Sequence, residues 1–113
     1  QVEEAAADSL AALSKLETLN AKVLAVSEIG AVYGDLCHGY SIIVGSFKSV
    51  SNAGRMAAKV ADEGYASSVL RFSNGMAAVA VEPRTKIADA VRVYEKVKSE
   101  KFCPDDAWIL SNN

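Results

Sequence analysis

The spacing of apolar residues divides this chain into one long helical segment followed by a series of short strands and helices. Residues 2–29 contain no proline or glycine, and apolar residues recur there every three or four positions, which predicts one helix of about seven turns. Its apolar stripe consists of Ala5, Ala12, Leu16, Leu19, Val23 and Val26. We expect this helix to pack on its own domain or on a second copy of the chain, or to form a coiled-coil spacer toward a membrane or partner.

Glycines at positions 30, 34 and 39 end the helical segment 1–30 and predict a linker over residues 31–39, followed by the domain proper at 40–113. The pattern in the domain predicts strands at 40–45, from 65 or 66 to 72, at 76–81 and at 107–110, with helices from Ser49 or Ser51 to about 63 and from Thr85 to about 100. Asn74-Gly75 predicts a tight hairpin turn because both residues tolerate positive φ, and Pro83 is expected to end the third strand.

The strand-helix-strand pattern occurs twice, at an offset of 37 positions. Ile42 aligns with Val79 and Tyr65 with Phe102, so one β-α-β unit is used in two copies. Short links and right-handed crossovers then predict an α+β fold of ferredoxin-like β-α-β-β-α-β order, a four-stranded antiparallel sheet with two helices on one face, plus the N-terminal helix. The other face is bare unless the N-terminal helix lies across it, and a ligand is expected there.

Composition and charge narrow the classes of function. With 113 residues, 50% of them hydrophobic and 23% charged, the chain fits one folded domain with an appendage. A net charge of −2 and the lack of a lysine- or arginine-rich run argue against nucleic acid as a partner, and no apolar run is long enough to span a bilayer. The chain begins with Gln1 rather than Met, which suggests that a leader has been removed or left out.

The two cysteines and the single histidine do not form a recognisable catalytic or metal site. Cys37 precedes the first strand and Cys103 the fourth, which are expected to be antiparallel neighbours. The two thiols would then lie about 17–20 Å apart, whereas a disulfide needs Cα atoms within about 7 Å, so two free thiols are predicted. His38 lacks a third orienting residue, and neither metal-ligand spacing nor a glycine-rich phosphate loop is present. We therefore expect no enzymatic activity, no metal and no cofactor.

Five motifs in a fixed order carry a resemblance to a known family. They are residues 40–47, Asn52-Ala53, Gly64-Tyr65, Asn74-Gly75 and residues 107–110. Together they resemble the SPOR (sporulation-related repeat) domain over about residues 40–110. The resemblance implies a non-catalytic bacterial cell-envelope module that binds peptidoglycan glycan strands, stripped of their stem peptides, through the open sheet face. It also implies a periplasmic or cell-envelope location, as for cell-division proteins and lipoproteins anchored through a removed N-terminal signal.

The resemblance also implies which residues contact the ligand. These are Ile43, Ser46, Phe47, Arg71, Ala78 and Trp108. Trp108 would stack on a sugar ring or seal the edge of the sheet, and Ser46 would donate to the glycan or cap a turn. Phe47 would contact the ligand or lie in the core. Arg71 would pair with the carboxylate that stripped glycan exposes, or with Glu82 across the hairpin.

Three departures from the family pattern make the predicted face less polar. Ile43 stands where the family strand has glutamine, Ala77-Ala78 replaces a Tyr-Arg pair, and residues 81–84 replace a second Val-Gly-Ser/Pro-Phe. A sugar is held by hydrogen bonds and by stacking on aromatic rings, and these replacements remove both kinds of contact. The apolar face also fits an alternative function, in which a degenerate SPOR domain is a scaffold for envelope proteins or for a homodimer formed through the N-terminal helix.

Overall fold

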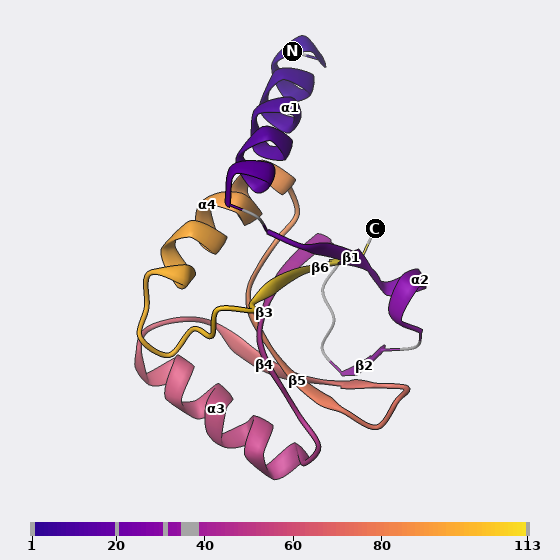
Figure 1. Ribbon diagram of the computed structural model, residues 1–113, viewed down its shortest axis with the longest axis vertical. Helices are drawn as coiled ribbons and strands as arrows, with labels where there is room; N and C mark the ends of the chain where they lie inside the picture. The colour runs from indigo at the N-terminus through magenta and orange to yellow at the C-terminus, as the bar shows by residue number, and fades with distance from the viewer. Residues whose placement is uncertain (1, 20, 31, 35–38, 113) are drawn as a thin grey trace.

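The computed structural model describes residues 2–19, 21–30, 32–34 and 39–112, and it contains one curled sheet with helices (Figure 1). The elements in chain order are α1 (Val2–Leu19), β1 (Val23–Ala25), α2 (Val26–Ile29), β2 (Val32–Gly34), β3 (Gly39–Phe47), α3 (Val50–Asp62), β4 (Ser67–Phe72), β5 (Ala77–Arg84), α4 (Ile87–Lys98) and β6 (Trp108–Asn112). In the sheet the strands follow the order β1-β6-β3-β5-β4-β2.

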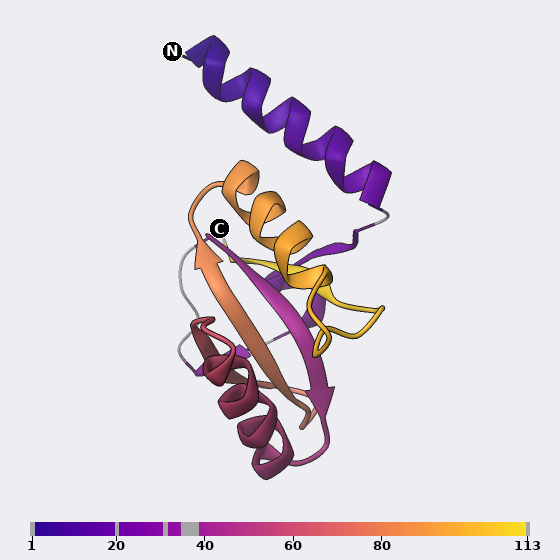
Figure 2. The same ribbon diagram turned by 90° about the vertical axis from the view of Figure 1, so that its left-hand side faces the viewer.

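The four central strands have the predicted β-α-β-β-α-β arrangement. β6, β3, β5 and β4 are antiparallel neighbours, and α3 and α4 lie together on one face of them (Figure 2). The two β-α-β copies are β3-α3-β4 and β5-α4-β6. Ile42 and Val79, which correspond between the copies, are both fully buried in the core under the helices. The Ser49 Oγ accepts a hydrogen bond from the Asn52 backbone N–H at 3.3 Å, which confirms Ser49 as the cap of α3.

The prediction of a four-stranded sheet is wrong, because the sheet has six strands. The predicted helix over residues 2–29 ends at Leu19, and the next segment supplies two more strands. β1 pairs in parallel with β6, and β2 pairs antiparallel with β4. A four-stranded sheet would leave the backbone N–H and C=O groups of β6 and β4 unpaired at its edges, and these short strands satisfy them. The division of the chain into a helix at 1–30, a linker at 31–39 and a domain at 40–113 stays a prediction. Two strands of the sheet, β1 and β2, come before residue 40.

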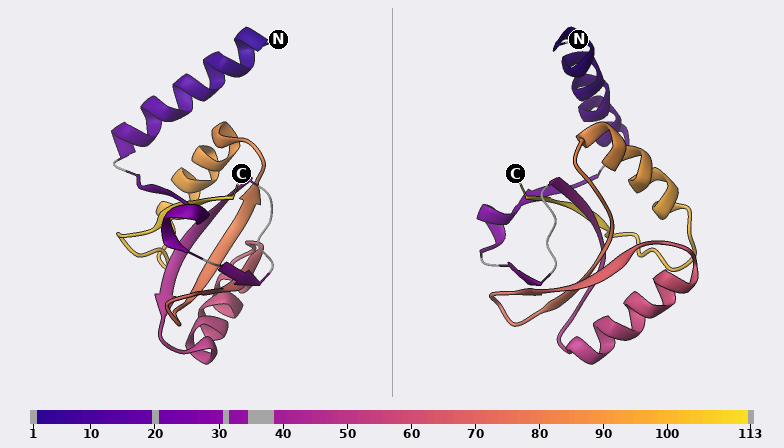
Figure 3. Two further views of the ribbon diagram at one scale, coloured as in Figure 1. Left: turned by 90° about the vertical axis from the view of Figure 1, so that its right-hand side faces the viewer. Right: turned by 180° about the vertical axis from the view of Figure 1, so that it is seen from behind.

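The sheet face opposite the helices is covered by the chain itself. We call residues 23–30 and 32–34 the strap; they run from β1 through α2 to β2 on the side away from α3 and α4 (Figure 3). Beneath the strap lies a second hydrophobic core in which no member is more than 5% exposed: Ile43, Leu70, Ala78, Ala80 and Leu110. Val26 and Val32 of the strap pack against it. The expected bare face is therefore an interior surface.

The N-terminal helix α1 does not cover that face either. It packs on α4, where Ala12 and Leu16 are each 5% exposed and Lys15 forms an ion pair with Glu95 at 3.5 Å. This arrangement matches the expectation that the helix docks on its own domain. No helix among the described residues combines the length and apolar character needed to cross a membrane.

The hairpin between β4 and β5 forms at the predicted place through a three-residue loop. The Phe72 N–H donates to the Met76 carbonyl at 2.8 Å, and the Gly75 N–H donates to the Phe72 carbonyl at 3.0 Å. Gly75 has φ of +89°, whereas Asn74 is not among the described residues with positive φ. A type I turn followed by a glycine with positive φ gives this geometry, so only one of the two residues needs the left-handed region.

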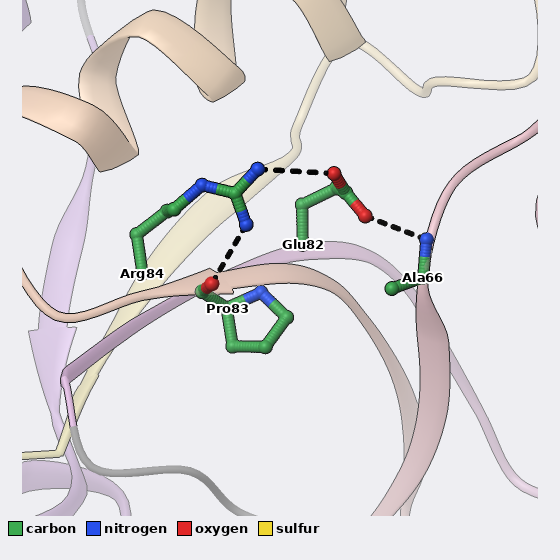
Figure 4. Close-up of polar contacts among 4 residues, drawn as sticks. All are labelled: Ala66, Glu82, Pro83 and Arg84. Carbon is green, nitrogen blue, oxygen red and sulfur yellow. Dashed lines mark hydrogen bonds and ion pairs between the residues drawn. The ribbon is translucent and has the colours of Figure 1, made fainter.

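β5 continues through Pro83, contrary to the prediction that the proline ends it. Glu82 has φ of +48°, which bends the strand. Its side chain makes polar contacts with Ala66 and with Arg84 (Figure 4). Its carboxylate accepts from the Ala66 N–H at 2.6 Å and pairs with the Arg84 guanidinium at 3.1 Å. The Arg84 guanidinium also donates to the Pro83 carbonyl at 2.8 Å. These contacts stabilise a strained backbone position at the point where proline cannot donate to a ladder. The following helix α4 begins after Lys86 rather than after Thr85.

Candidate functional site

The end of β3 runs past its neighbour β6. Pairing between the two strands stops at Ile43 and Trp108, whereas β3 continues to Phe47 and pairs only with β5 over this last stretch. Val44 is an extra residue in the β3–β5 ladder, since Ile43 lies opposite Ala80 and Gly45 opposite Val79. Among the described residues, no strand pairs on the β6 side with the backbone N–H and C=O groups of these last residues of β3.

A cleft of about 350 Å³ lies beside this open edge, and we call it the strand-end cleft. Three kinds of surface meet in it: aromatic rings, aliphatic groups and a few polar groups. Its lining residues are Ile43, Val44, Gly45, Ser46, Phe47, Met56, Phe102, Pro104, Asp106 and Trp108. β3, α3, the segment before β6 and β6 itself all contribute, so the cleft forms only when both β-α-β copies are folded.

Trp108 links the strand-end cleft to the second core. Its ring packs against that core and lies 6.4 Å from the Phe72 ring, centroid to centroid, although β3 and β5 separate the two strands that carry them. The curl of the sheet brings the rings together. Trp108 is neither fully buried nor fully exposed, so it closes one end of the second core and also borders the cleft.

The structure brings together only part of the predicted set of ligand contacts. Ser46 is exposed and Phe47 is half-buried, and both border the strand-end cleft with Trp108. Ile43 also borders it but is only 1% exposed, and Ala78 is 0% exposed under the strap. A ligand that touched either of these two side chains would have to displace neighbouring protein atoms. Their role in binding stays a prediction.

Arg71 lies apart from the strand-end cleft. It is exposed on β4, opposite Tyr33 of β2, and it borders a separate pocket of about 410 Å³ that also includes Tyr33 and Phe72. The alternative pairing of Arg71 with Glu82 is not formed, because Arg71 lies opposite Ala77 at the hairpin end of β4 and β5, whereas Glu82 lies beside Ala66 at the other end.

Six residues that line the cleft were not in the predicted set: Val44, Gly45, Met56, Phe102, Pro104 and Asp106. The repeat indicated one of them, because Phe102 corresponds to Tyr65 at the offset of 37 positions. These two rings pack edge to face at a centroid distance of 5.6 Å, which fixes the segment before β6 against the domain. Nothing local in the sequence marks Met56 or Asp106 as neighbours of Ser46, since they meet it only in the folded chain.

One ionisable group near the cleft is the Cys103 thiol. Burial raises the pKa of the Cys103 thiol, and Asp105 and Asp106 add to the rise while Lys98 opposes it. A thiol with a raised pKa stays protonated near neutral pH and is a poor nucleophile. Cys103 forms no disulfide, while Cys37 and His38 lie outside the described residues. Within the described part of the chain, no group of three or more metal-ligating side chains occurs.

Tyr65 has a large pKa shift. Burial and a short hydrogen bond that its hydroxyl donates to the Glu100 carboxylate raise the pKa of Tyr65 to about 12. The Lys96 ammonium lies 5.5 Å from the centroid of its ring. This cluster holds the segment after α4 against the domain and so fixes one wall of the cleft.

Comparison with protein families identifies the class of this protein. The family model of the SPOR domain matches residues 38–104, more than half of the chain, and the two β-α-β copies with their motifs agree with it. The chain belongs to the SPOR domain family. SPOR domains are non-catalytic modules that bind peptidoglycan, which points to the cell envelope. Comparison with curated proteins gives no match, and comparison with solved structures gives none either.

The matched range leaves out several features described above. It starts just before β3 and ends before β6, so α1, the whole strap and Trp108 lie beyond it. Peptidoglycan binding is therefore known for the family, while the strap and Trp108 of this chain lie outside the matched residues.

Proposed function

We propose that this chain binds peptidoglycan glycan strands freed of their stem peptides, on the periplasmic side of a bacterial envelope, and that a sugar unit is held in the strand-end cleft. One observation carries the proposal: Ser46, Phe47 and Trp108, three of the residues that the family resemblance implies, border the same cleft. The sheet face that the sequence suggested as the site is occupied by the strap.

The chemistry of the cleft suits a sugar ring. A pyranose presents hydroxyl and acetamido groups at its rim and a C–H face that packs on aromatic rings. Trp108, Phe47 and Phe102 supply aromatic surface, while the Ser46 hydroxyl and the open edge of β3 supply donors and acceptors. A volume of about 350 Å³ is at the lower end of the range of small-molecule pockets, about 300–1,000 Å³. Such a cleft accommodates a single sugar unit of a longer strand.

Binding on the covered sheet face is less favourable. A sugar there would have to displace Val26 and Val32 from the second core. Val26 and Val32 are partly buried, so exposing each of them costs part of the about 1.5–3 kcal/mol of a fully buried apolar side chain, and the side chains uncovered beneath are apolar and offer no hydrogen bonds. The energy cost would not be recovered by polar contacts.

Sedimentation with purified sacculi tests the proposal, before and after an amidase removes the stem peptides. We expect the chain to pellet with both preparations and to bind the amidase-treated one more tightly. A Trp108→Leu variant keeps apolar volume against the second core but loses the aromatic face, so we expect its affinity for treated sacculi to fall about tenfold, which is about 1.4 kcal/mol. Tyr33→Leu is the matched control, since Tyr33 is also partly exposed yet borders a different pocket.

Two results would contradict different parts of the proposal. If the chain pellets with neither preparation, it does not bind glycan. If Trp108→Leu remains folded by circular dichroism and binds as well as the parent chain, glycan binding occurs somewhere other than the strand-end cleft.

A second function, a scaffold for envelope proteins or for a homodimer, is favoured by one observation on α1. Leu10 is 66% exposed and Leu13 is 52% exposed, on a helix whose Ala12 and Leu16 pack on α4. Light scattering of the chain and of a Leu10→Gln, Leu13→Gln variant would test it. A dimer that the double substitution dissociates, together with no binding to sacculi, would favour the scaffold over the glycan-binding module.

A further inference from the structure

Asp106 gives the strand-end cleft a defined charge. It is the one ionisable side chain among the described residues that line the cleft. It is exposed, and its carboxylate forms no hydrogen bond or ion pair with another described residue. The nearby Lys98 ammonium donates instead to the carbonyl oxygens of Asp105, at 2.7 Å, and Pro104, at 3.5 Å. The cleft therefore carries one negative charge that forms no ion pair with a described residue.

The position of Asp106 is fixed by the turn in which it lies. The Ala107 N–H donates to the Pro104 carbonyl at 3.3 Å and closes this turn. The Tyr94 hydroxyl donates to the Ala107 carbonyl at 3.3 Å, and Ala107 is only 6% exposed. Because Ala107 is anchored in the core and Trp108 starts β6, the backbone of Asp106 is fixed two residues before the indole, and both residues line the cleft.

The charge bears on which sugar can occupy the cleft. A stripped strand alternates two amino sugars, and muramic acid carries a free lactyl carboxylate once its peptide is removed. Asp106 repels that carboxylate, whereas glucosamine is neutral when N-acetylated and carries an ammonium group when the acetyl group is missing. An ammonium in the cleft would form an ion pair that no other lining residue could provide.

We infer that the strand-end cleft takes a glucosamine unit and that Asp106 makes it selective for glycan whose glucosamine is N-deacetylated. This inference rests on the proposed function and specifies its ligand. Since Asp106 is exposed, the selectivity is modest: about fivefold in affinity at low salt, the upper range for an exposed ion pair, and less at high salt.

The single tryptophan provides a direct measurement, because Trp108 borders the cleft and is the one indole in the chain. Its fluorescence would be titrated with peptide-stripped glycan oligosaccharides and with the same oligosaccharides after N-deacetylation. Affinities would be compared among the parent chain, Asp106→Asn and Asp105→Asn. Asp105→Asn is a matched control, since it removes the same charge from the next residue, which is exposed and does not line the cleft.

The informative quantity is the ratio of the two affinities in each protein, because comparing this ratio between proteins cancels the effect of removing the acetyl group itself. We expect Asp106→Asn to lower the preference for the deacetylated glycan about fivefold and Asp105→Asn to leave it unchanged. If both glycans bind and the ratio is the same in all three proteins, the inference about Asp106 is wrong while glycan binding stands. If neither glycan binds the parent chain, the proposed function itself fails.

Discussion

Replacing Ile43 with glutamine would restore the residue that the family strand has at this position, and it tests whether the strap covers the sheet. Ile43 is 1% exposed and belongs to the second core with Leu70, Ala78, Ala80 and Leu110. A glutamine there would place an amide group in an apolar interior. On an open sheet face the same amide would point into water.

The magnitude follows from two losses. A fully buried isoleucine side chain contributes about 1.5–3 kcal/mol through burial, and the methylene groups of glutamine recover part of that. A buried amide without a hydrogen-bond partner costs a further 1–3 kcal/mol or so. We therefore expect Ile43→Gln to lower the free energy of unfolding by about 3–5 kcal/mol, a large share of the roughly 5–15 kcal/mol of an ordinary domain. Among the described residues of the parent chain, no buried side-chain nitrogen or oxygen lacks a partner.

Urea unfolding followed by circular dichroism and by Trp108 fluorescence would measure this change. Ser46→Gln is the control, because it puts the same side chain on the same strand at an exposed position, where the effect should stay within about 0.5 kcal/mol. If Ile43→Gln costs less than about 1 kcal/mol, the second core is not closed in solution and the reasoning that moved the ligand site to the strand-end cleft is refuted.

Two further changes test the backbone and the buried tyrosine. Gly39 has φ of +119°, and a Cβ added there would lie 2.3 Å from the Arg84 carbonyl oxygen, so Gly39→Ala should cost at least about 2 kcal/mol in thermal unfolding. Gly54→Ala, in α3 with no atom within 4 Å of its added Cβ apart from its chain neighbours and the backbone of the helix itself, should instead stabilise the chain by about 0.5–1 kcal/mol, and a loss there would contradict this account. Because the pKa of Tyr65 is raised to about 12 in the folded chain, its hydrogen bond to Glu100 stabilises the fold fully below about pH 10. Stability should then fall between about pH 10 and 12. Tyr65→Phe should reduce this fall and the tyrosinate absorbance that appears near pH 12, while Tyr94, whose pKa is also raised by burial, still titrates. An unchanged titration would argue against the buried hydroxyl.

Local signals account for the elements that were predicted correctly. Ser49 at the start of α3 and Gly75 in the hairpin act on the residues next to them, so their effect is visible in the sequence. The repeat predicted how the sheet and the two helices are arranged, because two copies of one β-α-β unit can share a sheet only with their helices on the same face. The predicted neighbours Ser46, Phe47 and Trp108 follow from that arrangement.

The strap was predicted wrongly for a physical reason. Val23 and Val26 continue the three-four spacing of α1, and a pattern of that kind does not reveal where a helix ends. A three-residue strand such as β1 or β2 has little stability by itself. β1 and β2 form because the edges of β6 and β4 offer unpaired backbone groups. Val26 and Val32 also pack against the second core.

The sequence by itself determined the family, the doubled β-α-β unit and the residues available for contact with a sugar, since these depend on short motifs and on spacing along the chain. The tertiary structure alone decided which of those residues share a surface: it buried Ile43 and Ala78, separated Arg71, and placed Asp106 beside Trp108 at the end of β3. The physical reason is that burial and edge pairing depend on segments that meet only after the chain has folded.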